Sequence, residues 1–422
     1  MKNIIYWKTK LTVLILVTFF TVLMFVNNAT AIPAFARKYK TSCITCHYAF
    51  PKLNAFGKAF RNNGYRYANG QDPEMTKDEP LSLGAESYKR VFPNAIWPSD
   101  IAGTTPLGVQ AIGRIHFDKD LTSFQIPNEV GLYFGGTMGD KISYWAELEW
   151  ENAEEFGKAI FINYDFSAGF HFKLGDIALN ASPQHLNLTS EDYNVAVLTT
   201  QSGEMTLGEG VGAGMEIWGA VNGPGGKGGL TYALGVGNGQ SDEENFDLNN
   251  KKDICGRITY KIGGLGEAGG TAGQSSNVSA YYIDNSFRIG GLFQTGTAIS
   301  ENMNDKYSIL GGDIDWWYKR LNVVGMAINM KSDYDNYSRN SFAYFIEGNY
   351  VLYPWLIAKS RYEYTNVDTN DNNLDPTNNL ITALVCMLRA NVRGTFEYRL
   401  PLDEPSRNAE MGRFTIQFAY AF

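Results

Sequence analysis

Downstream of residue 106 the chain consists of segments of about ten residues that alternate apolar and polar positions, and turn residues separate these segments. In the first segment, Leu107–Asp118, Val109 and Ile115 share one face, whereas Arg114 lies on the opposite face. Such a period of two predicts β-strands. A long series of them with short and long connections in alternation is typical of a transmembrane β-barrel.

Sixteen strands are predicted in this way, an even number that places both chain ends on the periplasmic side. Two further candidate strands, 83–92 and 277–283, leave the count uncertain by about two. The predicted strands are Leu107–Asp118, Asn128–Thr137, Ile142–Trp150, Lys158–Ser167, Gly169–Ile177, Gly210–Val221, Gly228–Gly237, Lys252–Ile262, Asn285–Thr297, Lys306–Trp317, Leu321–Lys331, Ser341–Leu352, Trp355–Val367, Asn379–Leu388, Asn391–Leu400 and Met411–Phe422.

The last predicted strand carries an unbroken apolar stripe that ends on Phe422. A terminal strand that ends in Phe resembles the assembly signal of bacterial outer-membrane proteins. The alternative is an ordinary strand of a soluble sandwich, which does not need so many long strands with an apolar outer face. On the strand count, long polar stretches such as 178–209 and 238–251 fall on the extracellular side.

Residues 1–31 have a basic start, an apolar stretch and an Ala29-Thr30-Ala31 sequence that fits signal-peptide cleavage. The alternative is a single transmembrane anchor. Cleavage removes three lysines and no acids, which takes the net charge from −8 to −11. This charge disfavours nucleic acid as a partner. We expect location in the outer membrane of a Gram-negative bacterium, in contact with its lipid.

Cys43-Ile44-Thr45-Cys46-His47 matches the Cys-x-x-Cys-His sequence of c-type haem attachment. In that motif two thioether bonds tether the porphyrin, and the histidine is the proximal axial ligand of the iron. The alternatives are a redox dithiol and half of a zinc site, but neither a thioredoxin-like context nor a second ligand pair is visible. We therefore expect one covalently bound c-type haem.

The haem segment, 32–94, is followed by a linker, 95–106, and the barrel, 107–422. The haem segment has about sixty residues, many of them polar and interrupted by Pro and Gly, which are few for an independent cytochrome core. We therefore expect side chains of the barrel to complete the environment of the haem. The predicted fold is an all-β transmembrane antiparallel barrel of about 16 strands, with a short α-helical haem segment in or at the lumen. A helix is expected to present Phe50, Leu53, Phe56 and Phe60 to the porphyrin.

The sequence does not fix the distal iron ligand. Met75 lies in the haem segment, and a thioether would raise the reduction potential. His116 and His171 both fall on positions that face the lumen of the predicted barrel.

The mature chain resembles the fused monohaem cytochrome porins, the outer-membrane iron oxidases of iron-oxidising bacteria. The residues that carry the resemblance are Pro33–Arg37 before the haem motif and Phe50–Gly57 after it, followed by Phe60 and Gly64-Tyr65. The resemblance implies that Cys43, Cys46 and His47 hold the haem. It also implies an Fe(II):cytochrome c oxidoreductase activity: the protein oxidises extracellular Fe(II) and passes the electron to a periplasmic c-type cytochrome or copper protein.

Acids in the predicted outer loops, among them Asp242, Glu243, Glu244 and Asp247, would attract Fe(II) through their negative potential and oxygen ligands. The alternative is that these loops are simply solvated. Two other functions remain open: a conduit for another electron donor, and a diffusion porin with a haem-bearing plug, whose channel Lys359, Arg361, Glu363, Arg393, Glu397 and Arg399 would line.

We predict that replacing Cys43 and Cys46 together with alanine abolishes covalent haem, because both thioether bonds come from this motif. Haem staining after denaturing electrophoresis measures the attached haem, with the wild-type chain at equal protein load as control. A full-strength haem band from the double variant would refute the motif assignment.

Overall fold

The computed structural model describes residues 34–79, 90–91, 93, 106–119, 121–151, 155–177, 188–189, 210–240, 247–270, 284–300, 303–334, 337–369, 376–403 and 412–421. Within these residues, sixteen antiparallel strands close into one barrel. Each strand pairs with its neighbours in sequence, and β18 pairs with β3 to close the ring. The predicted fold class and strand number are confirmed.

Every predicted strand overlaps one strand of the barrel. The strands are β3 Leu107–Phe117, β4 Thr122–Met138, β5 Ile142–Glu151, β6 Glu155–Ser167, β7 Phe170–Asp176, β8 Ala213–Asn222, β9 Lys227–Gly237, β10 Asp253–Leu265, β11 Ser286–Ser300, β12 Met303–Tyr318, β13 Leu321–Tyr334, β14 Tyr337–Tyr353, β15 Leu356–Asn366, β16 Thr377–Arg389, β17 Val392–Pro401 and β18 Arg413–Ala421.

The largest boundary difference is at β4, which begins at Thr122 instead of Asn128. Pro127 lies in the added part of the strand, and proline is unfavourable there because it cannot donate to a sheet ladder. The pairing of β3 with β4 is irregular at this point, since Ile112 pairs with Glu129 whereas Arg114 pairs with Gln125. This bulge accommodates the proline inside the strand. The additional candidate strands and Phe422 lie outside the described residues, except Arg90 and Val91 of the first.

The barrel is apolar on its outside and polar within. Ile258, Leu310 and Ile346 are 56%, 64% and 50% exposed on the outer face, whereas Arg361, Glu347 and Glu397 are buried. A soluble protein places these residue types the other way round. An apolar outer band around a polar interior is typical of membrane-spanning barrels.

Short connections predominate at one end of the barrel, but the asymmetry that we predicted is incomplete. The long stretch 266–285 joins β10 to β11 at that end, and the connections at 300–303 and 334–337 at the other end are short. The strands join tightly at 138–142, 167–170, 318–321, 353–356 and 389–392, and a short 3₁₀ helix, η2 (Pro224–Gly226), joins β8 to β9. We call this the short-turn end. No helix among the residues that the structure describes is long and apolar enough to cross a membrane.

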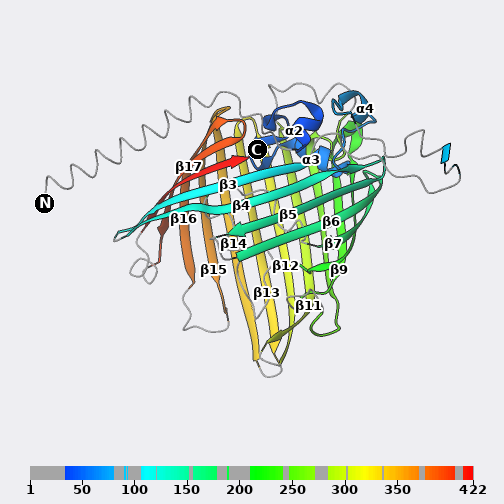
Figure 1. The fold of residues 1–422 in the computed structure, drawn as a ribbon. Coiled ribbons are helices and arrows are strands. Elements are labelled where there is room, and N and C mark those ends of the chain that lie inside the picture. The colour runs from blue at the N-terminus through cyan, green and yellow to red at the C-terminus, as the bar shows by residue number, and fades with distance from the viewer. Residues whose placement is uncertain are drawn as a thin grey trace.

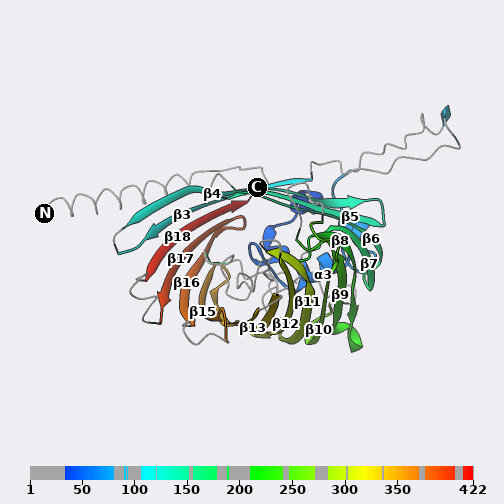
Figure 2. The ribbon, with the colours of Figure 1, turned by 90° about the horizontal axis from the view of Figure 1, so that it is seen from below.

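The N-terminal segment, residues 34–79, lies at the short-turn end, within the ring of strands (Figures 1 and 2). It is built from short elements, so its shape depends on the barrel around it. They are α2 (Ala34–Tyr39), η1 (Cys43–Thr45), β1 (His47–Ala49), β2 (Lys52–Leu53), α3 (Ala55–Asn62) and α4 (Asp72–Met75).

Ion pairs and hydrogen bonds fasten this segment to strands around the whole ring. Lys52 Nζ lies 3.5 Å from Glu347 of β14, and Lys58 Nζ lies 3.0 Å from Asp315 of β12. On the opposite wall, Arg66 lies 2.7 Å from Asp165 of β6. The segment therefore spans the lumen instead of hanging below it.

One connection that we predicted to be extracellular reaches into the barrel. Of the stretch 178–209, the structure describes Leu188 and Thr189, and both are buried. Leu188 belongs to an apolar cluster with Tyr48 and Ala49 of the N-terminal segment and with Val385 and other residues of the wall. The prediction is wrong for these two residues, because the apolar side chain of Leu188 packs against apolar side chains inside the lumen.

We predict that Leu310→Arg, midway along β12, destabilises the barrel in a lipid bilayer by about 2–4 kcal/mol, because it places a charge in the hydrocarbon. Leu121→Arg is the matched control: Leu121 is 63% exposed, almost as much as Leu310, but lies in the turn between β3 and β4. Urea titration in phospholipid vesicles measures both free energies of unfolding. Equal losses in the two variants would contradict a membrane-spanning barrel.

Candidate functional site

The Cys-x-x-Cys-His motif forms a compact loop on the N-terminal segment. Cys43 begins η1, the Cys46 amide donates to the Cys43 carbonyl at 3.2 Å, and His47 begins β1. Cys43 is buried, and Cys46 and His47 are partly buried. Both thiols are free. The three side chains needed for haem attachment thus leave the backbone within five consecutive residues.

His47 has the geometry and protonation state of a metal ligand. Its Nδ1 lies 2.7 Å from the Pro51 carbonyl oxygen, an acceptor that makes Nδ1 the protonated nitrogen. Burial lowers the pKa of His47 to about 4, so the ring is neutral at pH 7. In the described part of the chain no hydrogen-bond partner faces Nε2, whose lone pair is therefore available to iron. A backbone carbonyl on the other nitrogen is the usual way that proteins orient a ligating histidine.

Burial disfavours the thiolate form of both cysteines of the motif. Burial raises the pKa of the Cys43 thiol, and burial and the neighbouring Cys43 raise that of Cys46 to about 12. A reactive dithiol needs a lowered thiol pKa, so this alternative is disfavoured. No group of three or more His, Cys, Asp or Glu residues converges as a metal site within the described ranges. Two thiols and one imidazole within five residues are a donor set that fits a c-type haem, which Cys43, Cys46 and His47 would hold.

Asn54 and Gly57 fix the motif loop on helix α3. The Asn54 side chain accepts from the Gly57 amide at 2.8 Å, which caps the helix, and donates to the Thr45 carbonyl at 3.1 Å. The backbone amide of Asn54 donates to the Cys46 carbonyl at 2.9 Å. A Cβ atom on Gly57 would lie 2.1 Å from that same carbonyl oxygen, so only glycine permits this contact. The Asn-x-x-Gly spacing thus has a structural reason.

The predicted apolar face of a single helix is only partly correct. Helix α3 begins at Ala55, so Phe50 and Leu53 lie before it, in a turn and in β2. Phe50 packs against the apolar cluster around Tyr48 and Trp317, near the ring of His47. The stripe is broken because Pro51 and the β1–β2 pairing interrupt the helical spacing that the sequence suggested.

Phe56 and Phe60 do lie on α3, where they join an aromatic cluster within the segment. Phe60 contacts Phe35, Tyr39 and Tyr67 edge to face, with ring centroids 5.3 to 5.9 Å apart. Tyr65 continues the stack to Trp145 on the wall of the barrel, at 6.1 Å. This cluster is the core that the short segment could not form from aliphatic residues alone.

The distal-ligand candidates differ in availability. Both ring nitrogens of His171 have an oxygen partner, Asp165 at 2.8 Å from Nδ1 and the Asn62 carbonyl at 3.1 Å from Nε2, and the ring stacks on Trp218. His116 is bound at both nitrogens as well, to Thr415 and Gln125. Met75 ends α4 and is 38% exposed. Both histidines face the lumen as predicted, but only Met75 has no hydrogen bonds to break before its side chain could bind iron.

The proposed iron-attracting acids fall mostly outside the described residues, since these exclude Asp242, Glu243 and Glu244. Asp247 is described, and it forms an ion pair with Lys252 and accepts from the Asn249 amide at 2.9 Å. These contacts lower the pKa of Asp247, which keeps it ionised at neutral pH. On its own, Asp247 is therefore mainly a turn-forming residue.

The lumen contains apolar as well as charged regions. Thirteen apolar residues, mostly from β10 to β14, form a buried cluster that includes Met330, Phe345 and Ile328, each at most 2% exposed. The predicted lumen charges Lys359, Arg361, Glu363, Arg393 and Glu397 are also buried. Glu347 forms ion pairs with Lys359 and Arg361 in addition to Lys52. These regions of the lumen are packed, not open to water.

The sequence analysis did not use the excess of positive charge in the N-terminal segment, which positions the segment in the lumen. Residues 34–71 contain seven cations, Arg37, Lys38, Lys40, Lys52, Lys58, Arg61 and Arg66, and no acid, in a chain with net charge −8. Such a stretch indicates an acidic partner surface. That surface includes the lumen carboxylates of Asp165, Asp315 and Glu347.

No protein-family model matches the chain, and neither does any curated protein sequence. Solved porin structures are similar in fold. The anion-selective porin from Comamonas acidovorans superposes with a TM-score of 0.50 at 12% identity, over 75% of this chain and 98% of the porin. A porin refined at 1.8 Å resolution gives 0.51 at 9% identity, over 75% and 99%. At these identities the likeness establishes a porin-like barrel fold.

We predict that Gly57→Ala destabilises the N-terminal segment by about 1–3 kcal/mol, because the new methyl group collides with the Cys46 carbonyl. The sign of this change in unfolding free energy is informative, because Gly→Ala inside a helix otherwise stabilises by up to about 1 kcal/mol. Gly348→Ala is the control, because a Cβ there meets nothing within 4 Å. Protease susceptibility of the segment against urea measures the change. A stabilised Gly57→Ala segment would contradict the packing of α3 on the motif.

Proposed function

We propose that this protein is an outer-membrane electron conduit. It would oxidise extracellular Fe(II) and pass the electron, through one c-type haem on Cys43 and Cys46, to a periplasmic c-type cytochrome or copper protein. The observation that carries this proposal is the neutral, partly buried His47, held by the Pro51 carbonyl beside two free thiols. The short-turn end then faces the periplasm, as it does in bacterial barrels.

The haem would supply a one-electron Fe(III)/Fe(II) couple, which matches the one-electron oxidation of Fe(II). The chain's own residues provide the position and the environment. Asn54 and Gly57 hold the motif against α3, and the ion pairs of Lys52, Lys58 and Arg66 hold α3 inside the lumen. The apolar cluster around Tyr48 and Leu188 excludes water from one side of the motif.

The choice of Fe(II) as donor rests on the resemblance of residues 33–65 to monohaem cytochrome porins and on the acids of the loop 238–251. Negative potential at the outer end of the barrel would raise the local concentration of a divalent cation. Another small donor would use the same conduit equally well.

The second candidate is a diffusion porin with the segment as a plug, and it is favoured by the porin-like fold and by the charged lumen residues Arg361 and Arg393. Against it stand the packed apolar cluster of β10 to β14 and the segment across the lumen. Conductance in planar bilayers separates the two, because an open ion-selective pore would favour the porin.

We predict that Fe(II) reduces the haem of the purified protein in stopped-flow experiments. Neutralising Asp242, Glu243, Glu244 and Asp247 together to amides should slow this reduction several-fold at low salt and low Fe(II), with a smaller effect at high salt because ions screen the field. A matched control neutralises four acids near the short-turn end, Glu74, Asp78, Glu79 and Asp140. If another small donor reduces the haem and Fe(II) does not, the iron assignment fails.

A further inference from the structure

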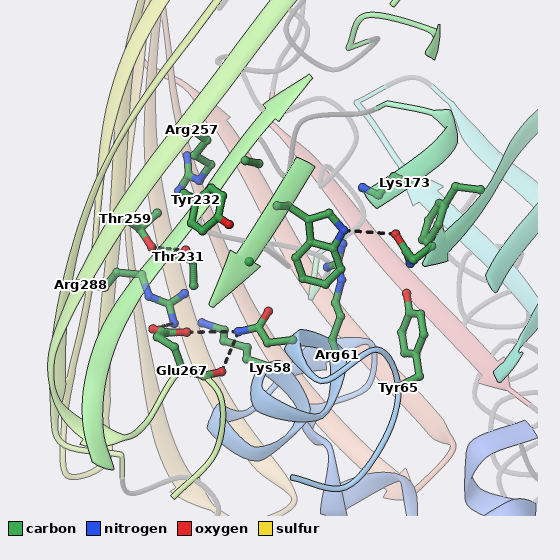
Figure 3. Close-up of a pocket in the computed structure, with 16 residues that line it drawn as sticks. Lys58, Arg61, Tyr65, Lys173, Thr231, Tyr232, Arg257, Thr259, Glu267 and Arg288 are labelled. Carbon is green, nitrogen blue, oxygen red and sulfur yellow. Dashed lines mark hydrogen bonds and ion pairs between the residues drawn. The ribbon is translucent and has the colours of Figure 1, made fainter. Parts of the chain in front are cut away.

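We propose that a cavity between the N-terminal segment and the lumen wall binds one oxyanion, a phosphate or carboxylate group. The cavity has a volume of about 70 Å³. Residues of α3 form one side, and residues of β6 to β11 form the other. Figure 3 shows Lys58, Arg61 and Tyr65 extending from the segment, opposite Arg257 and Arg288 of the wall.

Positive charge dominates the lining of this cavity. Five cations line it, Lys58, Arg61, Lys173, Arg257 and Arg288, together with one carboxylate, that of Glu267. Three of these cations pair with carboxylates that do not line the cavity: Lys58 with Asp315, Lys173 with Glu216 and Arg257 with Asp313. The cavity therefore lies on the cationic side of buried ion pairs, where an anion is stabilised.

The wall also offers hydrogen-bond donors of the right kind. Arg288 binds Glu267 through one terminal nitrogen at 2.6 Å, while its buried Nε has no hydrogen-bond partner. A buried, unsatisfied guanidinium N–H costs free energy unless an acceptor reaches it. Arg61 contacts the Tyr65 hydroxyl, and both line the cavity. Guanidinium groups form strong charge-assisted bonds with phosphate and carboxylate oxygens.

The size of the cavity fits a small oxyanion. One water molecule requires about 10–15 Å³ of such volume, so the cavity holds roughly five water-sized positions. Inorganic phosphate has about that number of non-hydrogen atoms. Trp218 and Phe161 form part of the wall, and their apolar surface lowers the local dielectric and strengthens the interaction with an anion.

The bound group has two possible sources: free phosphate, and a propionate carboxylate of the haem proposed on Cys43 and Cys46. Both present the same oxygen chemistry to Arg61 and Arg288. The site itself is independent of the proposed oxidation of iron, because phosphate binding requires no electron donor.

The test is phosphate binding to the full-length protein in detergent, measured by equilibrium dialysis with radiolabelled inorganic phosphate. We expect one phosphate per chain, and a dissociation constant raised at least tenfold by Arg61→Gln. Ala233→Leu, which fills the cavity without changing charge, should also weaken binding at least tenfold and stands in if the first variant does not fold. Arg320→Gln, at an exposed arginine of the short-turn end outside the cavity, should change it less than twofold.

A second arm distinguishes the sources. If a propionate occupies the cavity, phosphate binds only the haem-free Cys43→Ala/Cys46→Ala protein, and Arg61→Gln shifts the haem midpoint potential whereas Arg320→Gln does not. The proposal is overturned if neither protein binds phosphate and Arg61→Gln leaves the potential unchanged. It is equally overturned if Arg61→Gln and Ala233→Leu bind phosphate as tightly as the wild-type chain.

Discussion

Pairing between a basic N-terminal segment and lumen carboxylates is the interaction on which the rest of this structure depends. The segment has seven cations and no acid between residues 34 and 71, and it is too short to bury more than a small aromatic core. Inside the lumen, a lone charge would be costly, and a hydrogen-bonded pair offsets much of that cost. Asp165, Asp315 and Glu347 lie on different strands around the ring, so the pairs fix position as well as depth.

The contacts with the barrel explain how so small a segment holds the Cys-x-x-Cys-His motif in a defined conformation. The walls supply what an independent cytochrome would build from its own helices: Tyr48 and Ala49 pack against Trp317, Val385 and Leu188. Within the segment, Gly57 brings α3 against the Cys46 carbonyl. The same fit closes part of the lumen.

Much of the barrel follows from the sequence, because a period of two is local and each strand repeats it. Strand starts were less predictable where a bulge accommodates an unfavourable residue, as at Pro127 in β4. The assignment of Cys43, Cys46 and His47 to a haem rests on their spacing in the sequence and stays a prediction. The helical stripe was wrong at Phe50 and Leu53, because a two-stranded pairing intervenes. The lumen position of Leu188 and the cavity beside Arg61 arise from contacts between residues distant in sequence, which local patterns do not encode.

The most direct test of the account is electron transfer across a sealed bilayer. Proteoliposomes would trap oxidised cytochrome c inside, at the short-turn end of the barrel, and receive Fe(II) outside. We expect the wild-type protein, and not the Cys43→Ala/Cys46→Ala protein, to reduce the trapped cytochrome, while a trapped small dye is retained. Release of the dye, with the trapped cytochrome still oxidised, would contradict the conduit and establish a diffusion channel.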